Sequence, residues 1–572
     1  MDMNEPEVKT VHDLVIRNAT LVDGLGNPRR EGESLGVRDG RIAAMGPDVG
    51  RGAEEVDAAG RVLCPGIVDL HTHFDAQLTW DGYATPSVEL GVTTVVAGNC
   101  GFTIAPCREA DRDRTLRNLT HVEGMSLDAL RTGVDWDFES YPEYLAMLER
   151  KGAVPNVACF VGHSSVRTYV LGEEASSRPA TREEVAEMKR LVVDAMNAGA
   201  IGFSTTTLEQ HNGENGIPMP SRLADEHEMF ELTGALGEVG KGVFMLTKGM
   251  TSTVPWLEEI AARNGRPVMI AAMFVDPNDP ERVFRELDEI GDAKGRGREL
   301  WGQVGCFPLG MEFCLSHPYP LEALLAWRPA MEAASGGEFR RILSDASFRD
   351  AVKAEARTVG VPLRFSYHQW DHMRIMEAAR PENGELVGRV VGDLAREAGK
   401  DPFDWFLDHC LDGEMDSLVD CHMFNVDEDR VKELLEHPHG VLGLSDAGAH
   451  LSFLCDAGFG LHMLGHWARD RADMTLEHAV QAVTSRLADV YRIRERGRLE
   501  VGACADLLLF DPGSVGRGDR VRKWDLPAGA SRVHTPARGV HGVWVNGHRV
   551  ANDDGIMKNG ARPGKVLRDF TD

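Results

Sequence analysis

The chain has 572 residues, which is too long for one small domain and predicts one large domain with additions. Its 62 basic and 90 acidic residues give a net charge of −28, and a surface of that sign repels phosphate backbones, so we expect no nucleic-acid partner. The ten cysteines form no Cys-x-x-Cys pair, and neither a secretory signal nor an apolar run of roughly 18 residues is present, which predicts a cytoplasmic protein without a membrane partner.

Both ends of the chain have β-strand patterns. Residues 12–64 contain short apolar runs, with a strong hairpin-turn signal at Asp39-Gly40. Near the other end, residues 505–511 predict a strand, and residues 541–550 predict a hairpin around Asn546-Gly547. We therefore expect residues 1–64 and 490–550 to form one small β-sandwich domain, and residues 551–572 to form an extended tail.

Eight short apolar runs lie between these ends and alternate with helical patterns. The runs cover residues 66–70, 92–96, 157–161, 201–204, 243–246, 268–272, 300–304 and 440–444. Near-continuous apolar runs are typical of parallel strands buried on both faces. A capping box at Thr181 and Glu184 predicts a helix through Met196, and residues 255–263 and 280–290 predict two more. The pattern predicts an α/β fold, with a (β/α)₈ TIM-like barrel over residues 65–489.

A long interval separates the seventh apolar run from the eighth. Its helical patterns cover residues 321–333, 348–356, 387–398, 402–410 and 431–436. Long connections inside a compact domain are usually functional, as in active-site lids. We therefore predict a helical insertion over the barrel mouth at residues 315–435.

The first apolar run ends in two histidines, His71 and His73. Side chains two residues apart on a strand share a face, so both imidazoles would point into the barrel at its carboxyl end. Imidazole is a common metal donor, and two converging rings make half of a site for Zn²⁺. A pair of histidines in a surface turn is the alternative, and the apolar strand before the pair favours the metal.

Two further residues follow barrel strands and could complete the site. Cys100 lies just beyond the second run, where a thiolate would be a strong zinc ligand, although a buried structural thiol is the alternative. Asp446 ends the eighth run, where a carboxylate is costly unless it is paired or bound to a metal. We expect Asp446 to act as ligand and general base, with a helix N-cap as the competing interpretation.

Four more residues are weaker candidates. His450 could bind substrate or simply pack in its loop. His163 could face the metal, and Arg167 could hold a carboxylate, but a structural role is favoured for each alone. Lys248 could bridge two metals after carbamylation or bind an anionic substrate, while an exposed loop lysine is favoured.

These residues carry a resemblance to a known family. The stretches PGIVDLHTHFDAQ, GVTTVVAGNCGF, NVACFVGHSSVR, GAIGFSTT and GLSDAGAH resemble the amidohydrolase superfamily, most closely its D-aminoacylase (N-acyl-D-amino-acid deacylase) branch. The resemblance implies a metal-dependent hydrolase that cleaves a non-peptide amide C–N bond of a small molecule. It implies His71, His73, Cys100 and Asp446 as ligands of one or two divalent ions, most readily Zn²⁺, with Asp446 as acid and base. A homo-oligomer is left open.

One departure from the family concerns the fifth and sixth strands. The well-studied deacylases carry a histidine after each, whereas the corresponding stretches here are VFMLTKGM and VMIAAMFVD. We therefore expect either one metal on His71, His73 and Asp446 with Cys100 beside it, or a set completed by Lys248 or His163. A cyclic amide, imide or lactone hydrolase and a catalytically impaired barrel that only binds a ligand are the alternatives.

Overall fold

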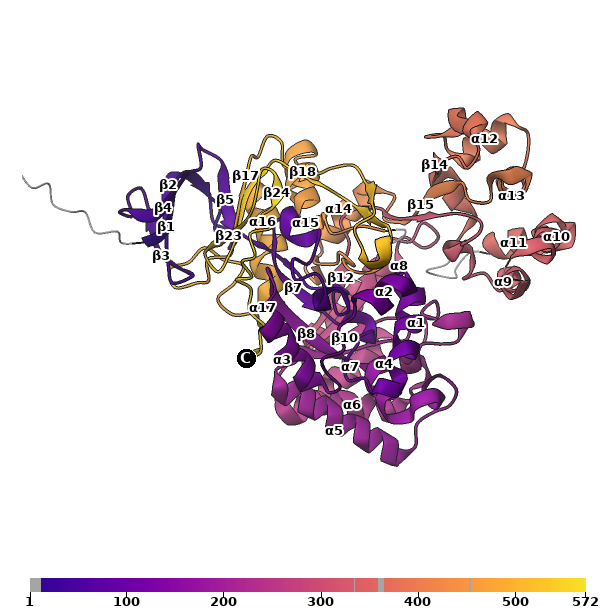
Figure 1. Ribbon diagram of the computed structural model, residues 1–572, viewed down its shortest axis with the longest axis horizontal. Coiled ribbons are helices and arrows are strands. Elements are labelled where there is room, and N and C mark those ends of the chain that lie inside the picture. Colours follow the sequence, from indigo (N-terminus) through magenta and orange to yellow (C-terminus); the bar gives the residue numbers. More distant parts are fainter. Residues whose placement is uncertain (1–11, 334, 359–364, 452–453, 572) are drawn as a thin grey trace, which may run out of the picture.

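The computed structural model describes residues 12–333, 335–358, 365–451 and 454–571, and an eight-stranded parallel sheet curled into a barrel lies at its centre (Figure 1). Each of the eight apolar runs contributes one of its strands, so the predicted barrel is confirmed. The order is β16-β12-β11-β10-β9-β8-β7-β6. The strands are β6 (Ile67–Asp69), β7 (Val92–Ala97), β8 (Asn156–Gly162), β9 (Gly202–Thr206), β10 (Val243–Thr247), β11 (Val268–Met273), β12 (Leu300–Val304) and β16 (Gly440–Val441).

The barrel closes between its first and last strands, just beyond their carboxyl ends. Thr72 forms a parallel bridge with Ala447. The Asp446 amide donates to the His71 carbonyl at 3.1 Å, and the His73 amide donates to the Ala447 carbonyl at 2.8 Å. The closing bonds therefore involve the two segments that carry three candidate site residues, at the end of the barrel where TIM-barrel active sites lie.

Helices cover the outside of the barrel, and the three that the sequence predicted there are present. Helix α5 (Arg182–Ala198) begins at a capping box formed by Thr181 and Glu184, and α7 (Val254–Asn264) and α8 (Arg282–Gly295) follow. None of the described helices combines the length and the apolar character needed to cross a bilayer. The other helices that pack on the barrel core are α1 (Arg112–Val122), α2 (Leu127–Gly133), α3 (Tyr141–Lys151), α4 (His163–Leu171), α6 (Glu226–Val239), α14 (Glu428–Glu436), α15 (Phe459–His462), α16 (Leu476–Val483) and α17 (Ser485–Val490).

Strands from both ends of the chain form one nine-stranded sheet beside the barrel, where the sequence predicted a sandwich. Strand β5 pairs antiparallel with β17 and so joins the two ends. Positive φ angles at Asp39-Gly40 and Asn546-Gly547 form the predicted hairpin turns. The strands are β1 (His12–Leu21), β2 (Arg30–Arg38), β3 (Arg41–Gly46), β4 (Gly52–Asp57), β5 (Val62–Pro65), β17 (Leu507–Phe510), β22 (Val540–Val545), β23 (His548–Asn552) and β24 (Gly555–Ile556). Two small hairpin sheets pair β18 (Gly516–Arg517) with β21 (Ala537–Arg538) and β19 (Val521–Lys523) with β20 (Arg532–His534).

The sequence predicts an extended tail for residues 551–572, and the structure describes this segment as far as Thr571. Strand β24 and the end of β23 belong to the nine-stranded sheet, and Val566 then bridges in parallel to Val157 of the barrel. Phe570 is fully buried. The tail is thus packed against the barrel, because it carries apolar side chains that the barrel surface covers. The polar segment of residues 1–11 lies outside the described residues.

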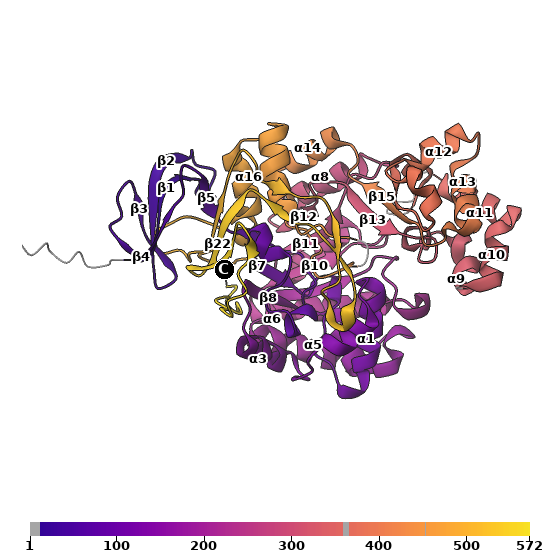
Figure 2. The ribbon, with the colours of Figure 1, turned by 45° about the horizontal axis from the view of Figure 1, so that its top comes forward.

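The insertion between β12 and β16 projects from the barrel on the side away from β1 to β4 (Figures 1 and 2). It has its own hydrophobic core, which contains Trp327, Trp370 and Phe406. The predicted helices are accompanied by a three-stranded antiparallel sheet that the sequence reading missed. The elements are β13 (Leu309–Phe313), α9 (Arg328–Ala333), α10 (Gly336–Ser344), α11 (Ala346–Ala356), β14 (Met373–Glu377), α12 (Val391–Glu397), α13 (Pro402–His409) and β15 (Leu418–Phe424).

The sheet was missed for a physical reason. An antiparallel strand with one exposed face mixes apolar and polar residues instead of forming a continuous apolar run. Strand β14, with the sequence MRIME, buries Met373 and Ile375 and exposes the residues between and after them. A search for continuous apolar runs therefore passes over it.

A buried polar group joins the barrel, the nine-stranded sheet and the tail. The Asp506 carboxylate accepts hydrogen bonds from the backbone N–H of Asn546 at 2.8 Å and from Asn156 Nδ2 at 3.1 Å. It also forms an ion pair with the buried Arg496 guanidinium. Asn546 Nδ2 donates to the Pro563 carbonyl at 2.8 Å. One carboxylate thus connects three parts of the chain.

Replacing Asp506 with alanine should lower the free energy of unfolding by about 3–5 kcal/mol, because the buried Arg496 would lose its counter-charge. Urea denaturation followed by circular dichroism measures the change. Asp519→Ala, which removes the partner of the exposed Arg538, is the matched control and should cost under about 1 kcal/mol. Equal losses in the two variants would contradict this role of Asp506.

Candidate metal centre

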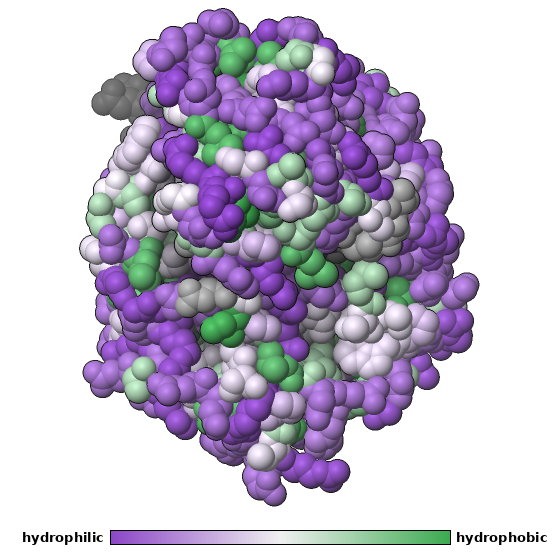
Figure 3. Space-filling model, turned by 90° about the vertical axis from the view of Figure 1, so that its right-hand side faces the viewer, coloured by the Kyte–Doolittle hydropathy of each residue, from purple (hydrophilic) through white to green (hydrophobic). Residues whose placement is uncertain are grey.

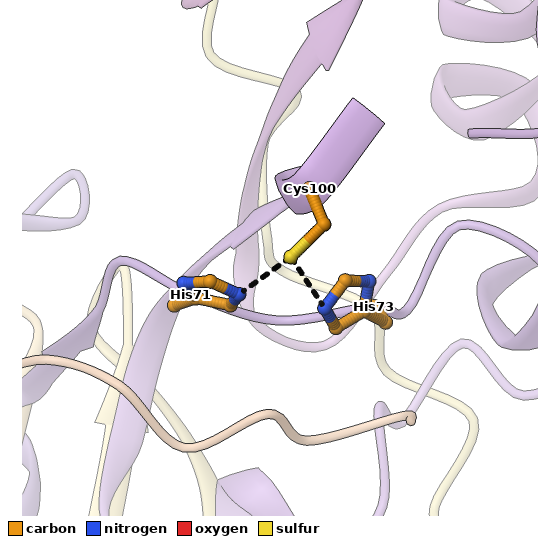
Figure 4. Close-up of side chains that lie close together, drawn as sticks. All are labelled: His71, His73 and Cys100. Atoms are coloured by element: carbon orange, nitrogen blue, oxygen red, sulfur yellow. Dashed lines mark hydrogen bonds between the residues drawn. The ribbon is translucent and has the colours of Figure 1, made fainter. Parts of the chain in front are cut away.

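Four side chains from three strand ends meet at the barrel mouth. His71 and His73 follow β6, Cys100 follows β7, and Asp446 follows β16. The Cys100 Sγ lies 3.4 Å from His71 Nε2 and 3.8 Å from His73 Nε2 (Figure 4). Asp446 Oδ1 lies 3.2 Å from His71 Nε2 and 3.4 Å from His73 Nε2. The structure therefore brings the four principal candidates into one cluster.

The spacing of the His71, His73 and Cys100 donor atoms fits three ligands of one zinc ion. Zinc lies about 2.3 Å from sulfur and about 2.0–2.1 Å from nitrogen or oxygen, so tetrahedral geometry separates S from N by about 3.6 Å and N from O by about 3.3 Å. The S–N separations of 3.4 and 3.8 Å match the first value, and Asp446 Oδ1 lies 3.2 and 3.4 Å from the two histidine nitrogens, close to the second. Two neutral imidazoles, a thiolate and a carboxylate would also neutralise a divalent charge.

Hydrogen-bond partners orient the imidazoles toward the centre of the cluster. Gln303 donates its amide to the Gly443 carbonyl at 2.9 Å, so its oxygen accepts from His71 Nδ1 at 2.8 Å. This leaves the lone pair of Nε2 facing the cluster. His73 Nδ1 lies 3.0 Å from Oε1 of the buried Glu123, although the angle is outside hydrogen-bond geometry. Buried acceptors behind the rings are the usual support of histidine ligands.

Cys100 reaches the cluster from a left-handed backbone. Its φ is +56°, a conformation that side chains other than glycine adopt at a cost. Ser204 holds the loop by accepting from the Gly101 amide at 3.1 Å and donating to the Gly98 carbonyl at 2.5 Å. The Thr247 hydroxyl donates to the Cys100 sulfur at 3.0 Å. The loop and this donor together aim an electron-rich sulfur at the histidines.

The charges of the cluster show why it would attract a cation. Burial lowers the pKa of the His71 imidazole, but Cys100 and Asp446 outweigh burial and raise that pKa to about 10. Burial raises the pKa of Asp446 and of the Cys100 thiol, yet the neighbouring histidines hold both below their ordinary values, Asp446 well below. Two buried anions thus retain positive charge on the imidazoles, and a divalent ion would supply that charge in place of protons.

A cavity of about 600 Å³ opens onto the cluster. Loops of the barrel line one side, and the insertion lines the other. His450 lines it too, with Nε2 3.9 Å from Asp446 Oδ2, and burial lowers the pKa of its imidazole. Lys248 also faces the cavity and pairs with Glu286 at 2.8 Å. Asp446 is the cluster side chain nearest to solvent, with 19% of it exposed against 3% for each histidine.

The structure does not bring His163 and Arg167 to the cluster. His163 uses Nδ1 toward Thr205 and Nε2 toward Glu228, both at 2.8 Å. Arg167 pairs with the same glutamate, and all three charged or polar side chains are at most 1% exposed. This group lies among β8, β9, α4 and α6, where it holds the barrel wall.

No histidine replaces the ones missing after the fifth and sixth strands. Thr247 ends β10 beside Cys100, and Ala272, in β11, lines the cavity. Within the part of the chain that the structure describes, His71, His73 and Cys100 are the one group of three or more histidine, cysteine or acidic side chains whose donor atoms converge. Asp446 adds a fourth donor to that group.

Several residues of the site were not found from the sequence. Gln303 lies inside a predicted strand, and its polar side chain in an apolar run was a signal that we did not use. Glu123 follows α1, away from any strand end, so no local pattern marks it. His211 follows β9, and its Nδ1 forms a hydrogen bond of 2.7 Å with the Thr206 hydroxyl. Burial lowers the pKa of this imidazole to about 3. Thr247 was not predicted as a site residue, although it directly precedes the candidate Lys248.

Comparison with known proteins was made against families, curated relatives and solved structures. The sequence profile of the Amidohydrolase family matches residues 54–551. A D-aminoacylase of Alcaligenes xylosoxydans xylosoxydans is 30% identical over 567 residues, covering 97% of each chain. A D-aminoacylase structure examined for one-metal activation and second-metal attenuation of its binuclear centre has a TM-score of 0.66 at 26% identity, covering 98% of this chain and all of that one. An N-acyl-D-glutamate deacylase of Bordetella bronchiseptica, complexed with zinc and a phosphonate mimic of the tetrahedral intermediate, has a TM-score of 0.65 at 26% identity with the same coverage.

Replacing Gln303 with leucine should weaken metal binding about 10- to 100-fold, because His71 would lose the acceptor that fixes its ring. Competition with a chromophoric chelator measures the affinity for Zn²⁺. Gln481→Leu, which removes a bond to the Leu25 carbonyl far from the cluster, should leave that affinity unchanged. Wild-type affinity in Gln303→Leu would argue against this orienting role.

Proposed function

The chain belongs to the amidohydrolase family, and we propose that it is a metal-dependent deacylase of N-acyl amino acids. The observation that carries this proposal is the group of His71, His73 and Cys100, with Asp446 beside both histidines, that faces a cavity at the barrel mouth. The related enzymes named above act on N-acyl-D-amino acids, which supports the same bond as the target here. The substrate panel described below measures whether the D- or the L-enantiomer is preferred.

His71, His73, Cys100 and Asp446 would hold a divalent ion, with Zn²⁺ the best match to their spacing. A divalent ion bound there would supply a positive charge to polarise the amide carbonyl and to lower the pKa of a nearby water. Thr247 and Ala272 stand where a second set of donors would be needed, so we propose one ion per chain. Lys248 forms an ion pair with Glu286, and a protonated amine has no lone pair to offer a second metal.

Asp446 would move the proton. It is ionised at neutral pH because its pKa is well below the ordinary value, so it is ready to accept a proton from the attacking water. It also faces the cavity, and its second oxygen points toward His450. The same carboxyl group would then deliver the proton to the leaving amine. A neutral His450 could donate to the substrate from the other side of Asp446.

We also propose a cytoplasmic location. All ten cysteines are free thiols, and eight of them are buried. Unpaired thiols in this number suit a reducing compartment better than an oxidising one. The acidic surface favours a small-molecule substrate over nucleic acid.

Asp446→Asn should lower kcat by at least about 100-fold, the usual range for loss of a general acid or base. A panel of N-acyl-D- and N-acyl-L-amino acids measures the activity, with the metal content of each preparation determined in parallel. Asp416→Asn, on an exposed hydrogen bond of the insertion, is the control and should match the wild type.

Full activity in Asp446→Asn would exclude this role for the carboxylate. Turnover of cyclic amides, imides or lactones without turnover of N-acyl amino acids would favour the alternative reaction class. Purified protein that takes up no stoichiometric divalent metal would favour a barrel that binds a ligand without catalysis.

A further inference from the structure

The cavity has two chemically different sides. The loops after β9 and β10 contribute the cations Arg222 and Lys248. The insertion contributes apolar side chains. These are Leu309, Met311, Leu325, Met331, Met423 and Phe424. The metal cluster lies on the same cavity, so a substrate with its amide at the cluster would meet both sides.

The barrel side carries two cations, Lys248 and Arg222, with acidic groups beside them. Glu286 is shared between Lys248 at 2.8 Å and Arg282 at 3.8 Å, so one carboxylate faces two cations. Arg222 donates to the His211 carbonyl at 3.2 Å and to the Asn212 side chain, which are neutral partners. Glu209 lies nearby, with one oxygen occupied by the Met250 amide at 3.0 Å. A substrate carboxylate would find its counter-charge here.

The insertion side presents apolar surface that the protein does not cover. Leu325 is 70% exposed, and Leu309, Met311 and Met331 are partly exposed. Figure 3, which views the molecule from the insertion end, shows hydrophobic side chains grouped near the middle of a mostly hydrophilic face. Apolar surface left open beside an active site marks the place of an apolar ligand group.

The charged residues Glu322 and Arg328 on the insertion side are compatible with an apolar ligand group there. Burial raises the pKa of Glu322 to about 7, so this carboxyl is partly neutral at neutral pH. Arg328 is exposed, at the rim. Both leave the methionine and leucine surface free to receive an uncharged chain.

We infer that the substrate is an N-acyl amino acid with a long apolar acyl chain, which the insertion binds while Lys248 binds the carboxylate. This inference rests on the proposed function. The acyl chain and the carboxylate leave the scissile amide in opposite directions, because one is attached through the carbonyl carbon and the other through the nitrogen. The two sides of the cavity match that arrangement.

A series of N-acyl amino acids from acetyl to octanoyl tests the acyl half of the inference. Each fully buried methylene should raise kcat/KM by about fourfold, so burial of about three of the extra methylenes makes octanoyl exceed acetyl by about 50-fold. Met311→Gln should reduce this octanoyl-to-acetyl ratio about tenfold. Met376→Gln, on strand β14 of the same sheet but away from the cavity, is the matched control and should keep the ratio.

Lys248→Met tests the carboxylate half. It should raise KM at least about tenfold for N-octanoyl amino acids and leave KM unchanged for the corresponding N-octanoyl amino-acid amides, which lack the charge. A flat acyl series in the wild type, together with hydrolysis of N-acetyl amino acids, would overturn this inference and leave the proposed function standing. Failure to hydrolyse any N-acyl amino acid would overturn both.

Discussion

The backbone hydrogen bonds that close the barrel are the constraint on which the site depends. They join residues 71–73 to residues 446–447, so the same bonds that complete the parallel sheet set Asp446 against two histidines. Below them, Ser445 donates to the buried Asp69 at 2.5 Å and ties the same two segments together. Closure of the fold therefore brings three of the candidate metal donors together, although they lie far apart in the sequence.

The insertion adds a second layer to that arrangement. The hydrophobic core of the insertion is separate from the barrel core. Two residues of the barrel mouth, Phe274 and Leu444, belong to the insertion core. Asn425 forms the joint, because its side chain accepts from the Val275 amide at 2.8 Å and donates to the Gly305 carbonyl at 3.2 Å. The barrel thus supplies the candidate metal donors, and a body with its own packing supplies the cavity wall that faces them. Under the proposed function, the reaction and the choice of substrate would depend on different parts of the chain.

Much of this could be predicted from the sequence, because the signals were local. Parallel strands that are buried on both faces have continuous apolar sequences, and the sequence predicted all eight of them. His71, His73, Cys100 and Asp446 follow the ends of three of these strands. The groups that support them could not be found in this way. Glu123 and Gln303 act through contacts across the barrel, and the roles of His163 and Lys248 are decided by the partners Glu228 and Glu286. Such pairings depend on tertiary structure, which one sequence does not display.

The left-handed backbone at the cluster has a consequence for how this chain can change. Cys100, Asp446 and His450 have φ angles of +56°, +49° and +53°, and in each place glycine would relieve strain of about 1–3 kcal/mol. Selection for thermal stability alone would therefore favour glycine at these candidate site positions. A stabilised variant with glycine at Cys100 or Asp446 would keep the barrel and lose a candidate metal donor.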